Sequence, residues 1–310
     1  MSGTIRNDAV SDAAWDMLSR FRPESIGPYS PGLVGRLREI VNAEYDPRAE
    51  RAVERNAVRL ERIELGGVQC IEVTPPDWEA GHFLLHIYGG GFIAGSAFQD
   101  LTIAAPLARL VRAKAVLPDC RVAPESPFPA ALHDVHSVYK ALVQRAHVEA
   151  FALSGVSAGG NLALAMLKKA LRDGADLPKA CALFSPWADI TNAGESLSAN
   201  DGRDPFLGRD FLEMAASLYA GGTPPELPEL SPLYGEFSAR MPPTIITTGT
   251  RDLLQSQSLA VAEAMRKAGM DVDLQIFDEM WHVFEFYDEL PEAARSVAMV
   301  AGFLRDHLAK

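Results

Sequence analysis

The sequence contains only three cysteines, Cys70, Cys120 and Cys181. An odd number of widely spaced cysteines provides no disulfide framework, and none belongs to the C-x-x-C pair of a structural metal site. Each lies in an apolar run, where a free thiol behaves as a small hydrophobic side chain. We therefore expect three buried, reduced thiols.

Basic residues are also scarce, because Lys and Arg total 29 against 41 Asp and Glu and the formal charge is -12. An acidic surface repels phosphate backbones and anionic lipid headgroups, which excludes nucleic acid and membrane as main partners. No apolar run approaches the roughly 18 residues of a membrane span, and residues 1–15 lack the basic start and apolar middle of a signal peptide. We expect a cytoplasmic protein.

Motifs for bound cofactors are absent as well. The glycines at 89–91 belong neither to G-x-G-x-x-G nor to a loop that ends in G-K-S or G-K-T, which argues against a nucleotide. His133 and His136 lie in one predicted helix, but no H-E-x-x-H pattern adds the carboxylate typical of a zinc enzyme. We expect neither a metal ion nor an organic cofactor.

The sequence does contain a regular alternation of short apolar runs and helix-length segments. Residues 57–65 and 68–74 predict two strands of a hairpin that turns at Gly66 and Gly67. Further apolar runs predict buried strands at 83–88, 113–117, 151–154, 181–185, 244–248 and 272–277. Spacings of three and four predict helices at 99–112, 130–146, 160–173, 253–268 and 292–308. This order predicts an α/β fold with a mostly parallel, eight-stranded sheet and helices on both faces.

Two segments do not fit the alternation. Residues 1–56 predict helices at 12–20 and 33–53, interrupted by the Pro- and Gly-rich stretch 22–32, with no strand of their own. Residues 190–242 separate two strands and are far longer than an ordinary connection. We expect both to form a helical lid, so that 1–56 is an N-terminal lid segment and 57–310 a catalytic domain with a lid insertion.

A candidate nucleophile lies in the G-x-S-x-G motif at 155–159, between a predicted strand and a predicted helix. A Ser on such a sharp turn has its hydroxyl exposed above the sheet, and small neighbours are needed because the backbone is crowded. The motif alone is weak evidence, since it also fits the glycine-rich start of a helix. Its place after a strand favours Ser157 as a nucleophile.

The glycines at 89–91 follow another predicted strand. Backbone N–H groups in such a loop can point at one spot and stabilise an oxyanion. A flexible turn would explain the glycines but not their position.

One of the seven histidines has the position expected of a catalytic base. His282 follows the last predicted strand, at the edge of a parallel sheet where catalytic groups collect. Asp252 follows the strand before it, although an Asp there could equally be a helix N-cap. The order Ser157, Asp252, His282 is the order of the α/β-hydrolase triad and favours the catalytic interpretation.

With these motifs the chain resembles the bacterial hormone-sensitive-lipase family of α/β-hydrolases over about residues 57–310. The resemblance rests on YGGGF at 88–92, DCRVAPE at 119–125, FPAA at 128–131, GVSAGGN at 155–161, SPW at 185–187, GTRDLL at 249–254 and MWHVF at 280–284. It implies a serine carboxylesterase in which Gly90, Gly91 and Ala158 donate the oxyanion-hole N–H groups. It also implies that Arg121 and Glu125 pair with each other beside the active-site loop.

Three positions depart from the family pattern. The family usually has His at the position of Tyr88, Asp or a small polar residue at Val156, and Tyr at Cys120. None of these exchanges removes a triad residue or an oxyanion-hole glycine. They change the surroundings of the glycine loop, where a Tyr ring fills space differently from an imidazole.

Aromatic residues near the motifs predict the size of the substrate site. Besides Tyr88, we expect pocket walls from rings beside the glycine loop, the SPW motif and the candidate base, namely Phe92, Trp187, Trp281 and Phe284. Several bulky rings around one nucleophile favour short-chain acyl esters of small alcohols. A lactonase or amidase with the same triad stays open, as does a non-catalytic ligand receptor, and a homodimer is compatible with the sequence.

Overall fold

The computed structural model describes residues 4–6, 10–20, 32–145 and 147–310. Its centre is a single sheet with the strand order β1-β9-β8-β7-β6-β4-β5-β3-β2. The strands are β1 (Thr4–Arg6), β2 (Arg59–Leu65), β3 (Val68–Thr74), β4 (His82–Ile87), β5 (Lys114–Pro118), β6 (Ala150–Val156), β7 (Cys181–Phe184), β8 (Thr244–Gly249) and β9 (Val272–Phe277). Strand β3 runs antiparallel to β2 and β5, and the other pairs are parallel, so the mostly parallel α/β sheet predicted from the sequence is confirmed.

The strand β1 corrects one expectation, because residues 1–56 were predicted to contain no strand. Residues 4–6 pair in parallel with Gln275–Phe277 at the edge of the sheet. Three residues are too few to produce an alternating pattern, so the pairing leaves no signal in the sequence. The eight predicted strands therefore gain a short ninth neighbour.

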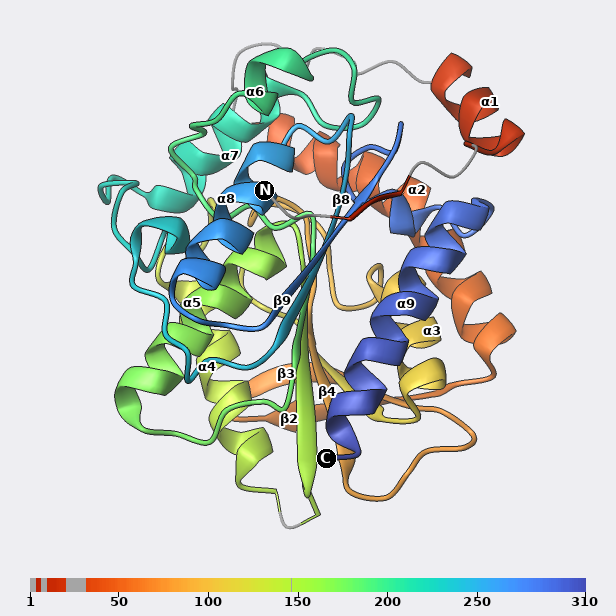
Figure 1. Cartoon of the computed structure of the whole chain (residues 1–310), viewed down its shortest axis with the longest axis vertical. Helices are drawn as coiled ribbons and strands as arrows, with labels where there is room; N and C mark the ends of the chain where they lie inside the picture. Colours follow the sequence, from red (N-terminus) through yellow and green to blue (C-terminus); the bar gives the residue numbers. More distant parts are fainter. Residues whose placement is uncertain (1–3, 7–9, 21–31, 146) are drawn as a thin grey trace.

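Helices cover both faces of the sheet. They are α3 (Leu101–Val111), α4 (Ala130–Val143), α5 (Ala158–Asp173), α8 (Gln255–Lys267) and α9 (Pro291–Leu308). In Figure 1 the sheet is seen nearly edge-on, with α3 and α9 on one side and α4, α5 and α8 on the other. Continuous apolar runs in the strands follow from this double cover, since both faces of each central strand are buried.

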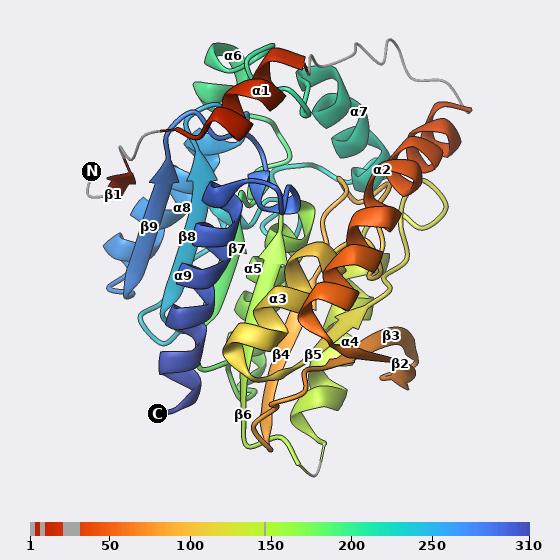
Figure 2. The same cartoon turned by 90° about the vertical axis from the view of Figure 1, so that its right-hand side faces the viewer.

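The segments outside the alternation lie at one end of the sheet. They contain α1 (Asp12–Arg20), α2 (Leu33–Asn56), α6 (Ser196–Ala199), α7 (Arg209–Ala220) and the 3₁₀ turn η1 (Pro232–Tyr234). Figure 2 shows α1, α6 and α7 together above the carboxyl ends of the strands, with α2 descending along α3. Most of the predicted break at 22–32 lies outside the described residues.

Two clusters form the hydrophobic core. The larger one surrounds the sheet and includes the three free, buried cysteines, as predicted. The smaller one joins Ala14 of α1 to the loop after β9, through Phe277, Met280, Trp281, Phe284, Tyr287, Leu290 and Ala293. This loop ends in the 3₁₀ turn η2 (Phe284–Phe286).

No helix in the described part of the chain is long and apolar enough to cross a membrane.

Candidate active site

Ser157 occupies a strained turn between β6 and α5. Its φ of 53° and ψ of -116° lie in a backbone region that residues other than glycine rarely adopt. The flanking glycines make the turn possible. A Cβ on Gly155 would lie 2.5 Å from the carbonyl oxygen of Gly159, and one on Gly159 would lie 2.1 Å from that of Ile87. The small residues of the G-x-S-x-G motif are thus required by close backbone contacts.

The imidazole of His282 connects Ser157 to Asp252. Its Nε2 lies 2.9 Å from Ser157 Oγ, and its Nδ1 lies 3.0 Å from Asp252 Oδ1. Ser157 follows β6, Asp252 follows β8 and His282 follows β9, so three parallel strands deliver the three side chains to the same edge of the sheet. The structure brings together all three residues selected from the sequence.

Asp252 is completely buried. Thr248 Oγ1 donates a hydrogen bond to its Oδ2 at 2.8 Å, and the Leu254 N–H donates to its Oδ1 at 2.8 Å. Burial by itself would raise the pKa of Asp252, but the charge and hydrogen bond of His282, with the other donors, hold that pKa below its usual value. The Asp252 side chain is therefore an ionised acceptor at neutral pH.

An ionised Asp252 fixes the proton of the imidazole. The His282 Nδ1–H donates to the carboxylate, which leaves Nε2 as the acceptor for the Ser157 hydroxyl. Burial would lower the pKa of His282, but the charge of Asp252 and its hydrogen bond outweigh burial and raise that pKa above its usual value. The arrangement can remove a proton from Ser157 and hold it as a stabilised imidazolium.

The glycine loop after β4 lies beside Ser157. Gly90 and Gly91 have φ of 118° and 64°, and the N–H groups of Ile93 and Ala94 both donate to the Gly90 carbonyl. Within the described residues, the N–H groups of Gly90, Gly91 and Ala158 donate to no protein acceptor. These three predicted oxyanion donors are therefore available to a ligand.

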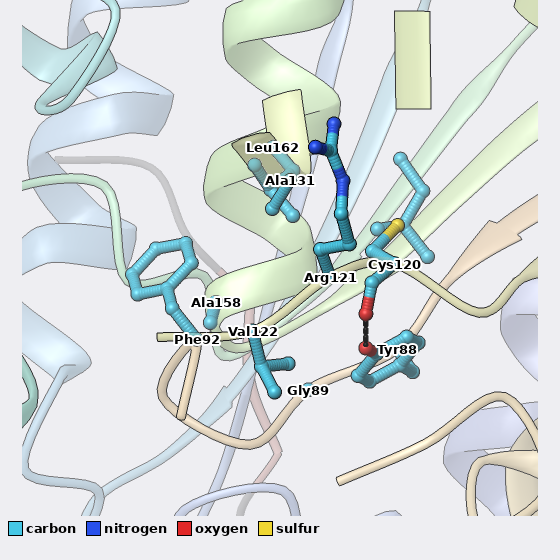
Figure 3. A pocket seen from close by; sticks show the side chains of 10 residues that line it. Tyr88, Gly89, Phe92, Cys120, Arg121, Val122, Ala131, Ala158 and Leu162 are labelled. Atoms are coloured by element: carbon cyan, nitrogen blue, oxygen red, sulfur yellow. Dashed lines mark hydrogen bonds between the residues drawn. The ribbon is translucent and has the colours of Figure 1, made fainter. Parts of the chain in front are cut away.

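A small, mostly apolar cavity lies against the start of α5 and the glycine loop (Figure 3). Of the residues selected from the sequence, Tyr88, Phe92 and Ala158 line it. The Tyr88 hydroxyl donates to the Cys120 carbonyl oxygen at 2.8 Å. Tyr88 thus ties the strand end before the glycine loop to the segment 119–125, in which Cys120 is itself a departure from the family pattern.

The other aromatic candidates divide into two groups. The Trp187 ring lies beside Phe92, with centroids 5.4 Å apart, and its indole N–H donates to Asn192 Oδ1. Trp187, Trp281 and Phe284 are all completely buried, and none of the three lines the cavity of Figure 3. Trp281 and Phe284 belong to the smaller core cluster, whereas Trp187 belongs to the larger one. The structure therefore places Tyr88 and Phe92 at the cavity, Trp187 against the Phe92 ring, and Trp281 and Phe284 in the smaller core cluster.

The expected pair between Arg121 and Glu125 is wrong. Arg121 instead forms a two-pronged ion pair with Asp134 of α4, and Glu125 forms one with Arg38 of α2. Residues 121–125 are not helical, so side chains four positions apart do not share a face. Each charge turns to a partner on a different helix.

Sequence reasoning missed a second buried set of Ser, His and Asp beneath the glycine loop. His86 Nδ1 lies 2.8 Å from Ser154 Oγ, and its Nε2 lies 3.0 Å from Asp100 Oδ2. Ser154 and His86 are 0% exposed, so no substrate reaches this serine. His86 and Ser154 face each other as register partners on β4 and β6, and this pairing of strands 68 positions apart leaves no local pattern in the sequence. In the part of the chain that the structure describes, no group of three or more His, Cys, Asp or Glu side chains is arranged to hold a metal ion.

Comparison with known proteins identifies the family of the chain. A family model for the α/β-hydrolase fold matches residues 84–286. The chain belongs to the α/β-hydrolase family. This hydrolase is 35% identical over 237 residues to an acetyl-hydrolase of Streptomyces hygroscopicus, which covers 76% of the chain and 79% of the relative. It is 30% identical over 249 residues to an esterase of Acinetobacter venetianus, which covers 79% of the chain and 82% of the relative.

A solved structure identifies the branch of the family. A hormone-sensitive lipase from a metagenome library superposes with a TM-score of 0.86 at 30% identity, over 97% of this hydrolase and 100% of that chain. The expected membership of the hormone-sensitive-lipase branch is confirmed, and the chain is a carboxylic ester hydrolase.

Proposed function

We propose that the hydrolase cleaves short-chain acyl esters of small alcohols through an acyl-enzyme on Ser157. The observation that carries the proposal is the continuous hydrogen-bonded chain from Ser157 Oγ through His282 to Asp252. A hydroxyl activated by a base that is itself oriented by a carboxylate is the arrangement needed for nucleophilic catalysis.

In the first step Ser157 Oγ attacks the ester carbonyl carbon while His282 Nε2 takes the hydroxyl proton. The imidazolium then gives this proton to the departing alkoxide, so that the alcohol leaves and the acyl group stays on Ser157. In the second step His282 takes a proton from water while the water oxygen attacks the acyl carbon. The imidazolium then gives this proton to Ser157 Oγ, so that the carboxylic acid leaves and the Ser157 hydroxyl is restored. Asp252 stabilises the imidazolium in both steps without accepting the proton.

The negative charge that develops on the carbonyl oxygen requires donors already in place. The unengaged N–H groups of Gly90, Gly91 and Ala158 are suited to this role, since the two glycines lie on a loop with close backbone contacts and Ala158 begins α5 directly after Ser157. Donors that are rigid before the reaction stabilise charge without a cost for reorganisation. No cofactor enters any step.

A short acyl group is favoured by the rings around the glycine loop. Phe92 stacks on Tyr219 of α7, and Trp187 lies against the same Phe92 ring. One relative is an acetyl-hydrolase, which also favours a small acyl group. We assign the covering role to the segments 1–56 and 190–242 as a lid. That Trp281 and Phe284 are walls of the substrate site stays a prediction, since both rings are completely buried.

The test is a panel of esters with acyl groups from acetyl to palmitoyl, together with a lactone and an amide of similar size, assayed on wild type and Ser157→Ala. We expect activity to rise to about butyryl or hexanoyl and to fall beyond it, because each accommodated methylene adds about 0.8 kcal/mol until the pocket is full. Greatest activity on palmitoyl esters would refute the small site. Greatest activity on the lactone or the amide would change the substrate class.

We also propose a cytoplasmic location and a homodimer. Three free, buried thiols agree with a reducing compartment, which supports the cytoplasm. Cell fractionation tests the location, and sedimentation of the purified chain tests the homodimer.

A further inference from the structure

A second buried carboxylate lies next to the catalytic loops. Asp204 belongs to the insertion, between α6 and α7, and is 0% exposed. Its Oδ1 accepts hydrogen bonds from the N–H groups of Phe206 and Leu207, each at 3.0 Å. Its Oδ2 accepts from the His282 N–H at 3.0 Å and the Leu253 N–H at 3.3 Å.

These contacts join three loops through one side chain. The turn 204–207 comes from the insertion, Leu253 follows the acid Asp252, and His282 is the base. A neighbouring side chain strengthens the junction, because Asn200 Nδ2 donates to the carbonyl oxygens of Thr250 and Asp252. The insertion therefore holds both the acid loop and the base loop from the side opposite the sheet.

The Asp204 side chain has four backbone donors but no Lys or Arg partner among the described residues. The nearest positive charge that forms during the reaction is the imidazolium of His282. The ionisable groups that influence His282 are Asp252, Asp204 and Glu285. Glu285 is also buried, and it accepts hydrogen bonds from Thr247 and Ser296.

The protonation of these groups follows from burial and charge. Burial raises the pKa of Asp204 to about 6, with a further increase from Asp252 and an opposing effect of His282 and the backbone donors. Burial also raises the pKa of Glu285. At pH 7 and above Asp204 is largely ionised, so its charge acts on the imidazole together with that of Asp252.

We propose that Asp204 is a positioning residue for the reaction, fixing the His282 backbone by a hydrogen bond and favouring the imidazolium form by its buried negative charge. It acts through His282 and touches neither substrate nor Ser157. The inference rests on the proposed function, because it assigns a role to the insertion only if His282 is the base. It makes the insertion part of the catalytic framework rather than only a cover.

The test is the pH profile of kcat/KM for Asp204→Asn with a water-soluble acetyl ester. Asn has nearly the same shape but no charge, and it has one acceptor oxygen for four donors. We expect kcat to fall about 10- to 100-fold with little change in KM, because the base is displaced. We also expect the midpoint of the acid limb to move down by roughly half to one pH unit, because a negative charge near His282 is lost.

The matched control is Asp201→Asn, which removes the same charge from an exposed position in the same segment. Its acid limb should stay at the wild-type position, since exposed charges are screened. A purely structural Asp204 would lower the melting temperature but leave the acid limb of Asp204→Asn unchanged, and that result would overturn the proposal. The proposal would also be overturned if Asp201→Asn moved the acid limb as far as Asp204→Asn does.

A measurement on wild type covers the case in which Asp204→Asn does not fold. The ring-proton chemical shift of His282 should titrate with a midpoint above the ordinary histidine value, because the buried charges of Asp252 and Asp204 favour the imidazolium. A midpoint at or below the ordinary value would contradict the inference. Ser157→Ala, measured in parallel, distinguishes failure of the proposed function from failure of the role of Asp204. If it keeps wild-type turnover, the proposed function fails; if it is inactive while Asp204→Asn matches wild type, only the role of Asp204 fails.

Discussion

The rings of Phe92 and Tyr219 lie nearly parallel, with centroids 3.7 Å apart and an angle of 4° between their planes. Phe92 follows the glycine loop, and Tyr219 is on α7, within the insertion. Tyr219 belongs to one face of α7 that also presents Phe211 and Ala215, because residues four apart lie on the same side of a helix. A Cβ on Gly91 would lie 2.8 Å from the Phe211 ring and 3.5 Å from Ala215. This face of α7 therefore covers the loop with the candidate oxyanion donors.

We predict that Phe211→Ala widens the acyl site. Removing the ring over Gly91 creates space beside the glycine loop, so the preferred acyl chain should lengthen by one or two methylenes. Each added methylene is worth about 0.8 kcal/mol, or roughly fourfold in kcat/KM. The measurement is kcat/KM over the series from acetyl to decanoyl esters. Ser217→Ala, on the exposed side of α7, is the control. An unchanged chain-length optimum in Phe211→Ala would show that α7 does not border the acyl site.

Gly90→Ala should damage catalysis more than binding. An added Cβ would lie 2.1 Å from the Ala94 carbonyl oxygen, so the loop must move. Its N–H groups would then no longer point at the position of the oxyanion. Loss of one oxyanion donor costs about 10²- to 10³-fold in kcat. The kcat for an acetyl ester should fall by this factor, while the inhibition constant of a non-reactive substrate analogue changes little.

The control for Gly90→Ala is Gly67→Ala in the hairpin between β2 and β3. Gly67 also has a positive φ, of 78°, but a Cβ there meets nothing within 4 Å. It reproduces the backbone strain without touching the site. Equal losses of rate and of analogue binding in Gly90→Ala would mean that the loop only shapes the pocket.

The sequence was sufficient for every strand of the sheet except β1 and for the candidate triad, because both depend on local patterns. Buried parallel strands are continuous apolar runs, as at 151–154, and their carboxyl ends meet at one edge, which located Asp252 and His282. The partners of isolated charges are different, because they are set by tertiary packing. Glu125 pairs with Arg38, 87 positions away, and Asp204 reaches His282 across 78 positions.

The direction of side chains in loops could not be predicted from the sequence either. Trp281 and His282 are neighbours in the same loop, yet the indole packs into the core cluster and the imidazole faces Ser157. A loop lacks the period of a helix or strand, so no spacing rule separates a core ring from a pocket wall. This is why the prediction for Phe92 could not be distinguished in the sequence from that for Phe284.

A buried lysine predicts how stability depends on pH. Lys168 of α5 is 6% exposed, and its Nζ donates to the carbonyl oxygens of Pro232 and Gly235 near η1. Burial lowers the pKa of Lys168 to about 7, from an ordinary value of 10.5. Between these values the unfolded chain keeps the proton and the folded protein does not. The free energy of unfolding should therefore rise with pH from about 7 towards 10.5, by up to about 1.4 kcal/mol per pH unit from this group, and this dependence should vanish below pH 7, where both states hold the proton.

The measurement compares urea unfolding of wild type and Lys168→Met at several pH values. The rise with pH should be smaller in Lys168→Met than in wild type. Lys169→Met removes a neighbouring, more exposed lysine that pairs with Asp173, and its pH dependence should follow wild type. Parallel pH dependence in wild type and Lys168→Met would show that the Lys168 pKa is not depressed.

The most direct test of the central claim is a rapid-mixing experiment with an activated acetyl ester, followed by mass analysis of the quenched protein. The account predicts a burst of about one alcohol per active site and an acetyl group on the peptide that contains Ser157. Ser157→Ala should show neither, with turnover reduced by a factor that approaches about 10⁶. A burst of the same size in Ser157→Ala, or an acetyl group found on another residue of the wild-type protein, would contradict the assignment of Ser157 as the nucleophile.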